Sequence, residues 1–115
     1  ESDNISGTSA ETYVHLFENI RRVFRERGIE ALYIALASYH PACISNGHGN
    51  SEDVRQAQKS LAKMYKDINP GPDTDKFDRC IDRHDGVHFS SIGLEKHADA
   101  WLKALRNKPS KRQGR

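Results

Sequence analysis

The chain has 115 residues, of which 36% are hydrophobic and 30% are charged, so we expect at most one ordinary folded domain. No apolar run approaches the roughly 20 residues of a transmembrane helix, so we expect no membrane span. Five of the 18 Lys and Arg residues lie in the last ten positions, and the rest of the chain has no basic face interleaved with aromatic residues, which argues against nucleic-acid binding.

The spacing of apolar residues predicts a first helix from about residue 9 to residue 27. Thr8 and Glu11 have the spacing of a capping box, and Gly28 is a natural stop. Apolar residues recur at intervals of three and four, as expected for one buried face: Tyr13, Leu16, Phe17, Ile20, Val23 and Phe24.

The apolar segment 29–37 predicts a strand buried on both faces, as in a parallel sheet covered by helices. A loop over residues 38–50 follows it. Long loops at the carboxyl end of a buried strand are where α/β proteins place their sites. His40 and His48 lie in this loop, and solvated side chains without a role are one interpretation of both.

Two further helices are predicted, from about residue 52 to 65 and from about residue 91 to 105. Asn50 or Ser51 caps the earlier one. The residues expected to be buried are Val54, Ala57, Leu61 and Met64 in the earlier helix and Leu94, Ala98, Trp101, Leu102 and Leu105 in the later one. Residues 69–73, rich in Pro and Gly, are expected to form a turn.

The predicted strands are too few for a complete sheet. Segment 29–37 is convincing, whereas 66–69 and 87–89 are weak candidates, and a lone strand or pair leaves sheet edges unpaired. The sequence also begins at Glu1 without an initiator Met. We therefore expect an α/β fragment of a longer chain whose preceding part supplies the other strands of the same domain.

The densest group of polar residues, over positions 82–93, precedes the last helix. Asp85 stands three residues before His88, and Gly86 between them allows the chain to turn so that the carboxylate reaches the imidazole Nδ1. Such a pair fixes the tautomer and leaves Nε2 free to accept a proton from a nucleophile. The alternative is a solvated loop with an incidental histidine.

Several separated motifs support the first interpretation. They are Glu1-Ser2-Asp3, Val54-Arg55-Gln56-Ala57-Gln58, Gly71-Pro72-Asp73-Thr74-Asp75, Arg83-x-Asp85-Gly86-Val87-His88-Phe89-Ser90, Gly93 and Ala98-x-x-Trp101. In this order they resemble the C-terminal part of SGNH (GDSL-like) hydrolases. More narrowly, they are similar to the carbohydrate-esterase branch typified by sialate O-acetylesterases and related acetylxylan esterases.

The resemblance implies a flavodoxin-like α/β/α three-layer fold with a parallel sheet. It also implies hydrolysis of O-acetyl esters on carbohydrates without cofactor or metal, with His88 as general base and Asp85 as its partner. The family's serine nucleophile and an oxyanion-binding glutamine lie before residue 1. We therefore expect residues 1–105 to be the C-terminal portion of such a domain, inactive alone, and residues 106–115 to be a basic disordered tail.

Further residues are candidates for substrate binding or support of the site: Glu1, Asp3, His40 and Arg83. Glu1 and Asp3 match the family's central motif, but they are as easily explained as a frayed terminus. Arg83 contacts substrate or forms an exposed ion pair. Ser2 matches a serine that is not the nucleophile, and Ser90 is better explained as the cap of the last helix.

Cys43 and Cys80 lie in loops that open on the same edge of the expected sheet. A disulfide is therefore geometrically possible, and it would favour a secreted or periplasmic location, whereas two thiols remain the alternative. A rival interpretation is a zinc site of Cys80, His84, His88 and Cys43, which Gly86 makes less regular. A catalytically dead carbohydrate-binding or scaffold module is a third.

Overall fold

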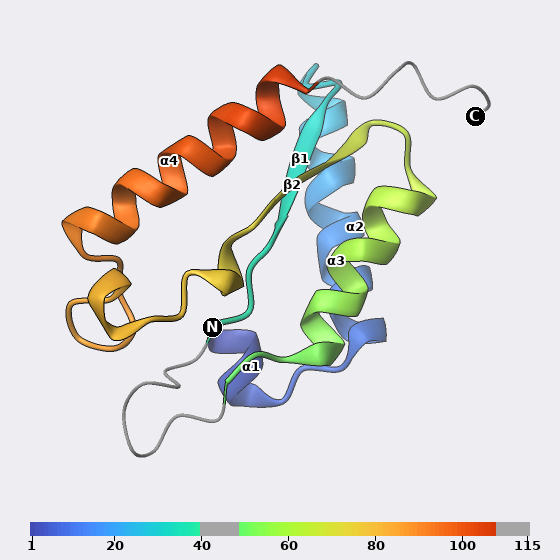
Figure 1. Ribbon diagram of the computed structural model, residues 1–115. Coiled ribbons are helices and arrows are strands. Elements are labelled where there is room, and N and C mark those ends of the chain that lie inside the picture. The colour runs from blue at the N-terminus through green and yellow to red at the C-terminus, as the bar shows by residue number, and fades with distance from the viewer. Residues whose placement is uncertain (40–48, 108–115) are drawn as a thin grey trace.

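A computed structural model of the chain describes residues 1–39 and 49–107 (Figure 1). The helices are α1 (Ser2–Ser6), α2 (Ala10–Glu26), α3 (Glu52–Met64) and α4 (Ser91–Arg106), with 3-10 turns η1 (Thr74–Lys76) and η2 (Cys80–Asp82); the strands are β1 (Leu32–Leu36) and β2 (Ile68–Asp73). The α/β class is confirmed. The sheet formed by the described residues has two parallel strands, so the wider flavodoxin-like domain is not seen in this part of the chain.

The pairing of β1 with β2 overturns the turn predicted at residues 69–73. Leu32 lies opposite Ile68, and the register slips between Ile34 and Leu36. Pro70 and the other proline of β2 cannot donate hydrogen bonds, but a strand at the edge of a sheet tolerates that loss. The weak candidate at 66–69 therefore overlaps a real strand. The weak candidate at 87–89 forms no strand, although Phe89 joins an isolated antiparallel bridge.

Gly71 explains why α4 packs directly onto β2. A Cβ at this position would lie 2.8 Å from the Trp101 ring, which is closer than side chains normally approach. The ring also makes an edge-on contact with Tyr33 of β1, at 6.4 Å between centroids. The absence of a side chain at Gly71 thus lets one aromatic residue of α4 reach both strands.

The core lies on the side of the strands covered by α2 and α3, which pack together there, while α4 lies on the other side (Figure 1). Its buried centre consists of Ile34, Leu61, Ala62 and Ile68, with Tyr13, Val14, Phe17 and Tyr65 packed around it. The inner face predicted for α3 is confirmed at Val54, Ala57 and Leu61, whereas Met64 is exposed.

Much of the apolar surface expected to be buried is exposed instead. The affected residues are Leu16, Ile20, Val23 and Phe24 of α2 and Leu94, Ala98, Leu102 and Leu105 of α4. Each helix needs only part of its apolar stripe to cover two strands. Within the described ranges, no helix is both long and apolar enough to cross a bilayer.

The helix starts follow local hydrogen bonding. The capping box predicted at Thr8 is wrong, because Ser9 caps α2 and its Oγ accepts a bond from the Thr12 N–H. Ser51 caps α3 and Ser90 caps α4, as expected. The short helix α1 was not predicted, and it orders the terminal residues for which fraying was one alternative.

A buried polar network joins the carboxyl ends of the two strands. Ser38, just after β1, donates its N–H and Oγ–H to the two carboxylate oxygens of Asp75, at 2.7 and 2.8 Å. Arg55 of α3 donates to Asp75 at 2.9 Å and to both oxygens of Asp73 at 2.8 Å. Asn4 of α1 donates to the Ser38 carbonyl at 2.7 Å. Three elements are therefore fixed around one carboxylate that is 1% exposed.

Replacing Arg55 with Met keeps most of the side-chain volume but leaves the Asp75 carboxylate buried without its cation. We expect Arg55→Met to lower the free energy of unfolding by about 3–5 kcal/mol, measured by urea denaturation. Arg22→Met is the control, because its pair with Glu26 is exposed and we expect it to cost less than about 1 kcal/mol. Equal losses in the two variants would contradict this role.

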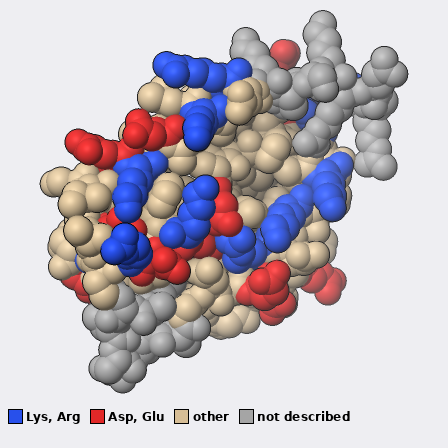
Figure 2. Space-filling view, viewed as in Figure 1, with Lys and Arg blue, Asp and Glu red and all other residues tan. Residues whose placement is uncertain are grey.

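Acid should destabilise the fold through carboxylates that are bonded to basic groups. Hydrogen bonds from Arg55 lower the pKa of Asp73, and a hydrogen bond from Lys96 lowers the pKa of Asp82. Figure 2 shows acidic and basic side chains lying close together on one face. A carboxyl group with a lowered folded-state pKa stabilises the fold above its ordinary pKa, and this stabilisation is lost as the pH falls through the lowered value.

We therefore expect the free energy of unfolding to be nearly constant from about pH 7 to pH 5 and to fall between about pH 5 and pH 2, measured by urea unfolding at several pH values. Arg55→Met should show a shallower fall, because it removes the contribution of Asp73. A chain that is equally stable at pH 6 and pH 3 would contradict the expectation.

Candidate active site

The loop that follows η2 is closed on itself before α4 begins. Arg83 and Phe89 form an antiparallel bridge. Inside this bridge the His84 N–H donates to the His88 carbonyl at 3.0 Å. Gly86 takes a φ of 83°, a left-handed conformation that side chains disfavour, and so permits the reversal between them. The loop thus holds two histidines and an aspartate in a short backbone turn.

Asp85 makes the contact with His88 that the sequence predicted. Its Oδ2 lies 2.6 Å from the His88 Nδ1, and its Oδ1 accepts bonds from the N–H groups of His88 and Val87 at 2.7 and 2.8 Å. The backbone bond from His88, its ring and the Val87 N–H hold the pKa of Asp85 well below its ordinary range. This arrangement orients the imidazole and leaves Nε2 for another group. The catalytic roles of both residues stay predictions.

Arg83 is buried, so the exposed ion pair expected for it is wrong. Its guanidinium lies between the rings of Tyr39 and Phe89, 4.1 and 3.8 Å from their centroids. It donates to the carbonyls of Phe77 and Val87 at 2.9 and 2.7 Å, and within the described ranges it forms no ion pair. Burial lowers the pKa of Arg83. The side chain therefore connects the loop to the end of β1.

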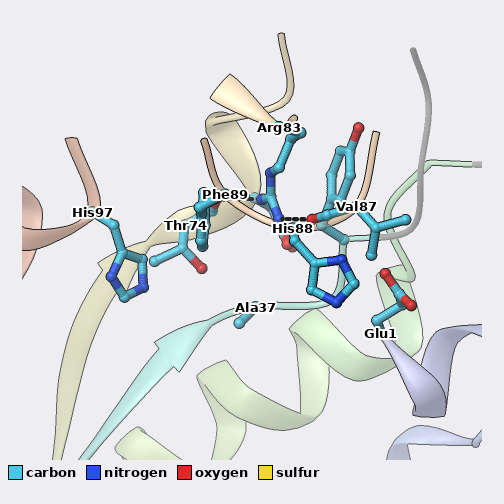
Figure 3. A pocket seen from close by; sticks show the side chains of 10 residues that line it. Glu1, Ala37, Thr74, Arg83, Val87, His88, Phe89 and His97 are labelled. Atoms are coloured by element: carbon cyan, nitrogen blue, oxygen red, sulfur yellow. Dashed lines mark hydrogen bonds between the residues drawn. The ribbon is translucent and has the colours of Figure 1, made fainter. Parts of the chain in front are cut away.

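A pocket of about 370 Å³ opens beside His88, at the carboxyl ends of the two strands (Figure 3). Its polar walls are Glu1, Tyr39, Thr74, Asp75, Arg83, His88 and His97, and its apolar walls are Ala37, Val87 and Phe89. The His88 ring points into the space from the loop above it, with Glu1 to one side (Figure 3). The pocket thus lies at the sheet edge where the sequence predicted a site.

The remaining candidates fall in different places. Glu1 lines the pocket, whereas Asp3 does not, and its carboxylate accepts a bond from Thr8 Oγ1 at 2.9 Å. His40 lies outside the described residues, as does His48. His97 of α4, which the sequence did not single out, lines the pocket, and its ring centroid lies 4.9 Å from that of Phe89. Its position one helical turn after Gly93, where α4 meets the loop, was the available signal.

No serine among residues 1–39 and 49–107 lines the pocket. Ser38 stands between two residues of the wall, but it is fully buried and its Oγ is bonded to Asp75. The Ser90 Oγ donates to the Ile81 carbonyl and accepts from the Gly93 N–H, as a helix cap does. The described residues therefore bring a histidine and an aspartate into contact at the pocket, with no serine beside them.

Cys80 is disulfide-bonded, and its expected partner Cys43 lies outside the described residues. The zinc set that included the Cys80 thiolate is therefore wrong. A different group remains: His84, Asp85 and His88 each offer one ligand atom, and these atoms lie within 4.8 Å of one another.

Helix α4 contacts the loop at Gly93 and Lys96. A Cβ at Gly93 would lie 2.1 Å from the Asp82 carbonyl oxygen and 3.0 Å from the Phe89 ring. Lys96 donates to the buried Asp82 carboxylate at 2.6 Å. The helix can approach this closely only because position 93 has no side chain, so Gly93 determines where the loop lies.

Gly93→Ala should push α4 away from the loop, since the obstacle is backbone and cannot rotate aside. We expect a loss of about 1–3 kcal/mol in the free energy of unfolding, and changed amide chemical shifts at His84 and His88. Glu95→Ala, on the exposed side of the same helix, should leave both unchanged. Wild-type stability and an undisturbed loop in Gly93→Ala would contradict the close packing.

The chain matches no protein-family model, no curated protein and no solved structure. Its function is therefore argued from the residues of the loop and the pocket.

Proposed function

We propose that this chain supplies the base of a serine esterase that removes acetyl groups from carbohydrates. The observation that carries the proposal is the contact of 2.6 Å between Asp85 Oδ2 and His88 Nδ1 at the wall of a pocket. The pocket lies where two parallel strands end, the usual place for a site in an α/β protein. The order of the motifs, which resembles that of carbohydrate esterases, supports the substrate class.

In the proposed reaction, His88 Nε2 accepts the proton of a serine hydroxyl as the serine oxygen bonds to the acetyl carbon. The imidazolium, stabilised by the Asp85 carboxylate, then returns that proton to the sugar oxygen as the ester bond breaks. Water, activated by the same imidazole, releases acetate from the serine in a second cycle. The serine and the oxyanion-binding groups come from residues outside this chain.

The proposal also places β1 and β2 in a larger parallel sheet of the flavodoxin-like type. Two observations support it: helices lie on both sides of the two strands (Figure 1), and α2 and α4 expose apolar residues such as Leu16 and Leu102. Further strands beside β1 and β2 would give these residues a surface to cover. The part of the same domain that precedes Glu1 is the proposed source of those strands.

The test is acetate release from O-acetylated sugars by the protein made from the whole reading frame that encodes this chain. His88→Ala should lower kcat by about 1,000-fold or more, and Asp85→Asn by a comparable factor, because each removes part of the proton-transfer unit. His15→Ala, which alters an exposed histidine of α2, is the control and should keep full activity.

The 115-residue chain by itself should release no acetate above the buffer rate. The esterase proposal fails if His88→Ala leaves the rate of the whole protein unchanged, or if the whole protein hydrolyses no acetylated sugar. Turnover by the isolated chain that depends on a serine and on His88 would instead show that the nucleophile lies within these residues.

A further inference from the structure

The loop carries a second arrangement that the esterase chemistry does not use. The His84 and His88 rings lie face to face, with centroids 5.9 Å apart and planes inclined by 21°. Asp85 lies beside them, and one possible ligand atom from each of the three residues falls within 4.8 Å of the others. All three side chains are exposed, so solutes reach them without any rearrangement of the fold.

The backbone beneath these side chains is already fixed. The bond from the His84 N–H to the His88 carbonyl and the bridge between Arg83 and Phe89 hold the two histidines opposite each other. Asp85 is held by two backbone N–H groups. A ligand that needs all three side chains therefore has to order only their outer torsions, which lowers the entropic cost of binding.

The donor types select the ligand. Two imidazoles and one carboxylate suit Zn²⁺ and neighbouring transition metals, whereas Ca²⁺ and Mg²⁺ prefer sites made of oxygen alone. Ligand atoms about 2.1 Å from a tetrahedral ion lie roughly 3.4 Å apart. The three ligand atoms now lie within 4.8 Å of one another, so small rotations of the exposed side chains bring them to that spacing. Asp85 Oδ2 and His88 Nδ1 face each other at 2.6 Å, so an ion that binds both atoms replaces the hydrogen bond between them.

We propose that His84, Asp85 and His88 bind one divalent transition-metal ion, for which Zn²⁺ is the test ion. This site uses no cysteine and so differs from the set that the sequence suggested. One consequence rests on the proposed function: an ion bound to His88 Nδ1 replaces the hydrogen bond to Asp85 and leaves the ring proton on Nε2, so Nε2 can no longer accept the serine proton. Metal binding and general-base catalysis at His88 then exclude each other, and the metal acts as an inhibitor.

The experiment is calorimetric titration of ZnCl₂ into the untagged chain, without any ester substrate. We expect one Zn²⁺ ion per chain, affinity at least about tenfold weaker in His84→Ala, and unchanged affinity in His15→Ala. His84 is the informative position because its side chain has no part in the proposed esterase chemistry. In ¹H–¹⁵N spectra of the imidazoles, Zn²⁺ should shift the signals of His84 and His88 and leave His15 unaffected.

Two results would overturn the metal site: equal zinc affinity in His84→Ala and wild type, or no binding up to millimolar ZnCl₂. Zinc bound only through other histidines gives the first of these results. The titration measures zinc binding alone. The absence of zinc binding therefore does not contradict the esterase proposal, and a protein without esterase activity can still bind zinc.

Discussion

The Asp75 carboxylate is the group on which the arrangement of this molecule depends. Taking a charge out of water is costly unless hydrogen bonds and an opposite charge replace the solvent, and here Ser38 and Arg55 do so. Ser38 lies just after β1, Arg55 lies in α3 and Asp75 follows β2, so the hydrogen bonds of one carboxylate fix the ends of both strands against the same helix. The same carboxylate then forms part of the wall of the pocket beside His88.

The features that could be predicted from the sequence are those determined by neighbouring residues. The cap at Ser90 and the contact of Asp85 with His88 each join groups three residues apart, so the local sequence determines both contacts. The buried face of α3 was also predictable, because its apolar residues follow the helical period and this face lies against both strands, with Leu61 fully buried.

The features that could not be predicted depend on segments distant in the chain. The two prolines in residues 69–73 predict a turn when this segment is considered alone. In the folded chain the segment is a strand because it pairs with β1. A charged residue such as Arg83 is predicted to be exposed. It is buried because the rings of Tyr39 and Phe89 pack against its guanidinium. The place of His97 in the pocket follows from the close approach of α4 to the loop at Gly93, a tertiary contact that helical periodicity does not reveal.

The enclosure of Arg83 has a consequence for how the site responds to its surroundings. A guanidinium stays protonated over the whole range in which proteins fold, even where burial lowers its pKa. The group that connects the loop to the end of β1 is therefore insensitive to acidity. Lysine would be a poor replacement. It lacks the planar guanidinium that stacks on the two aromatic rings, and it lacks the forked N–H groups that donate to the Phe77 and Val87 carbonyls. The position of the loop thus depends on a permanent positive charge, so a change of pH within the range in which the protein folds does not release it.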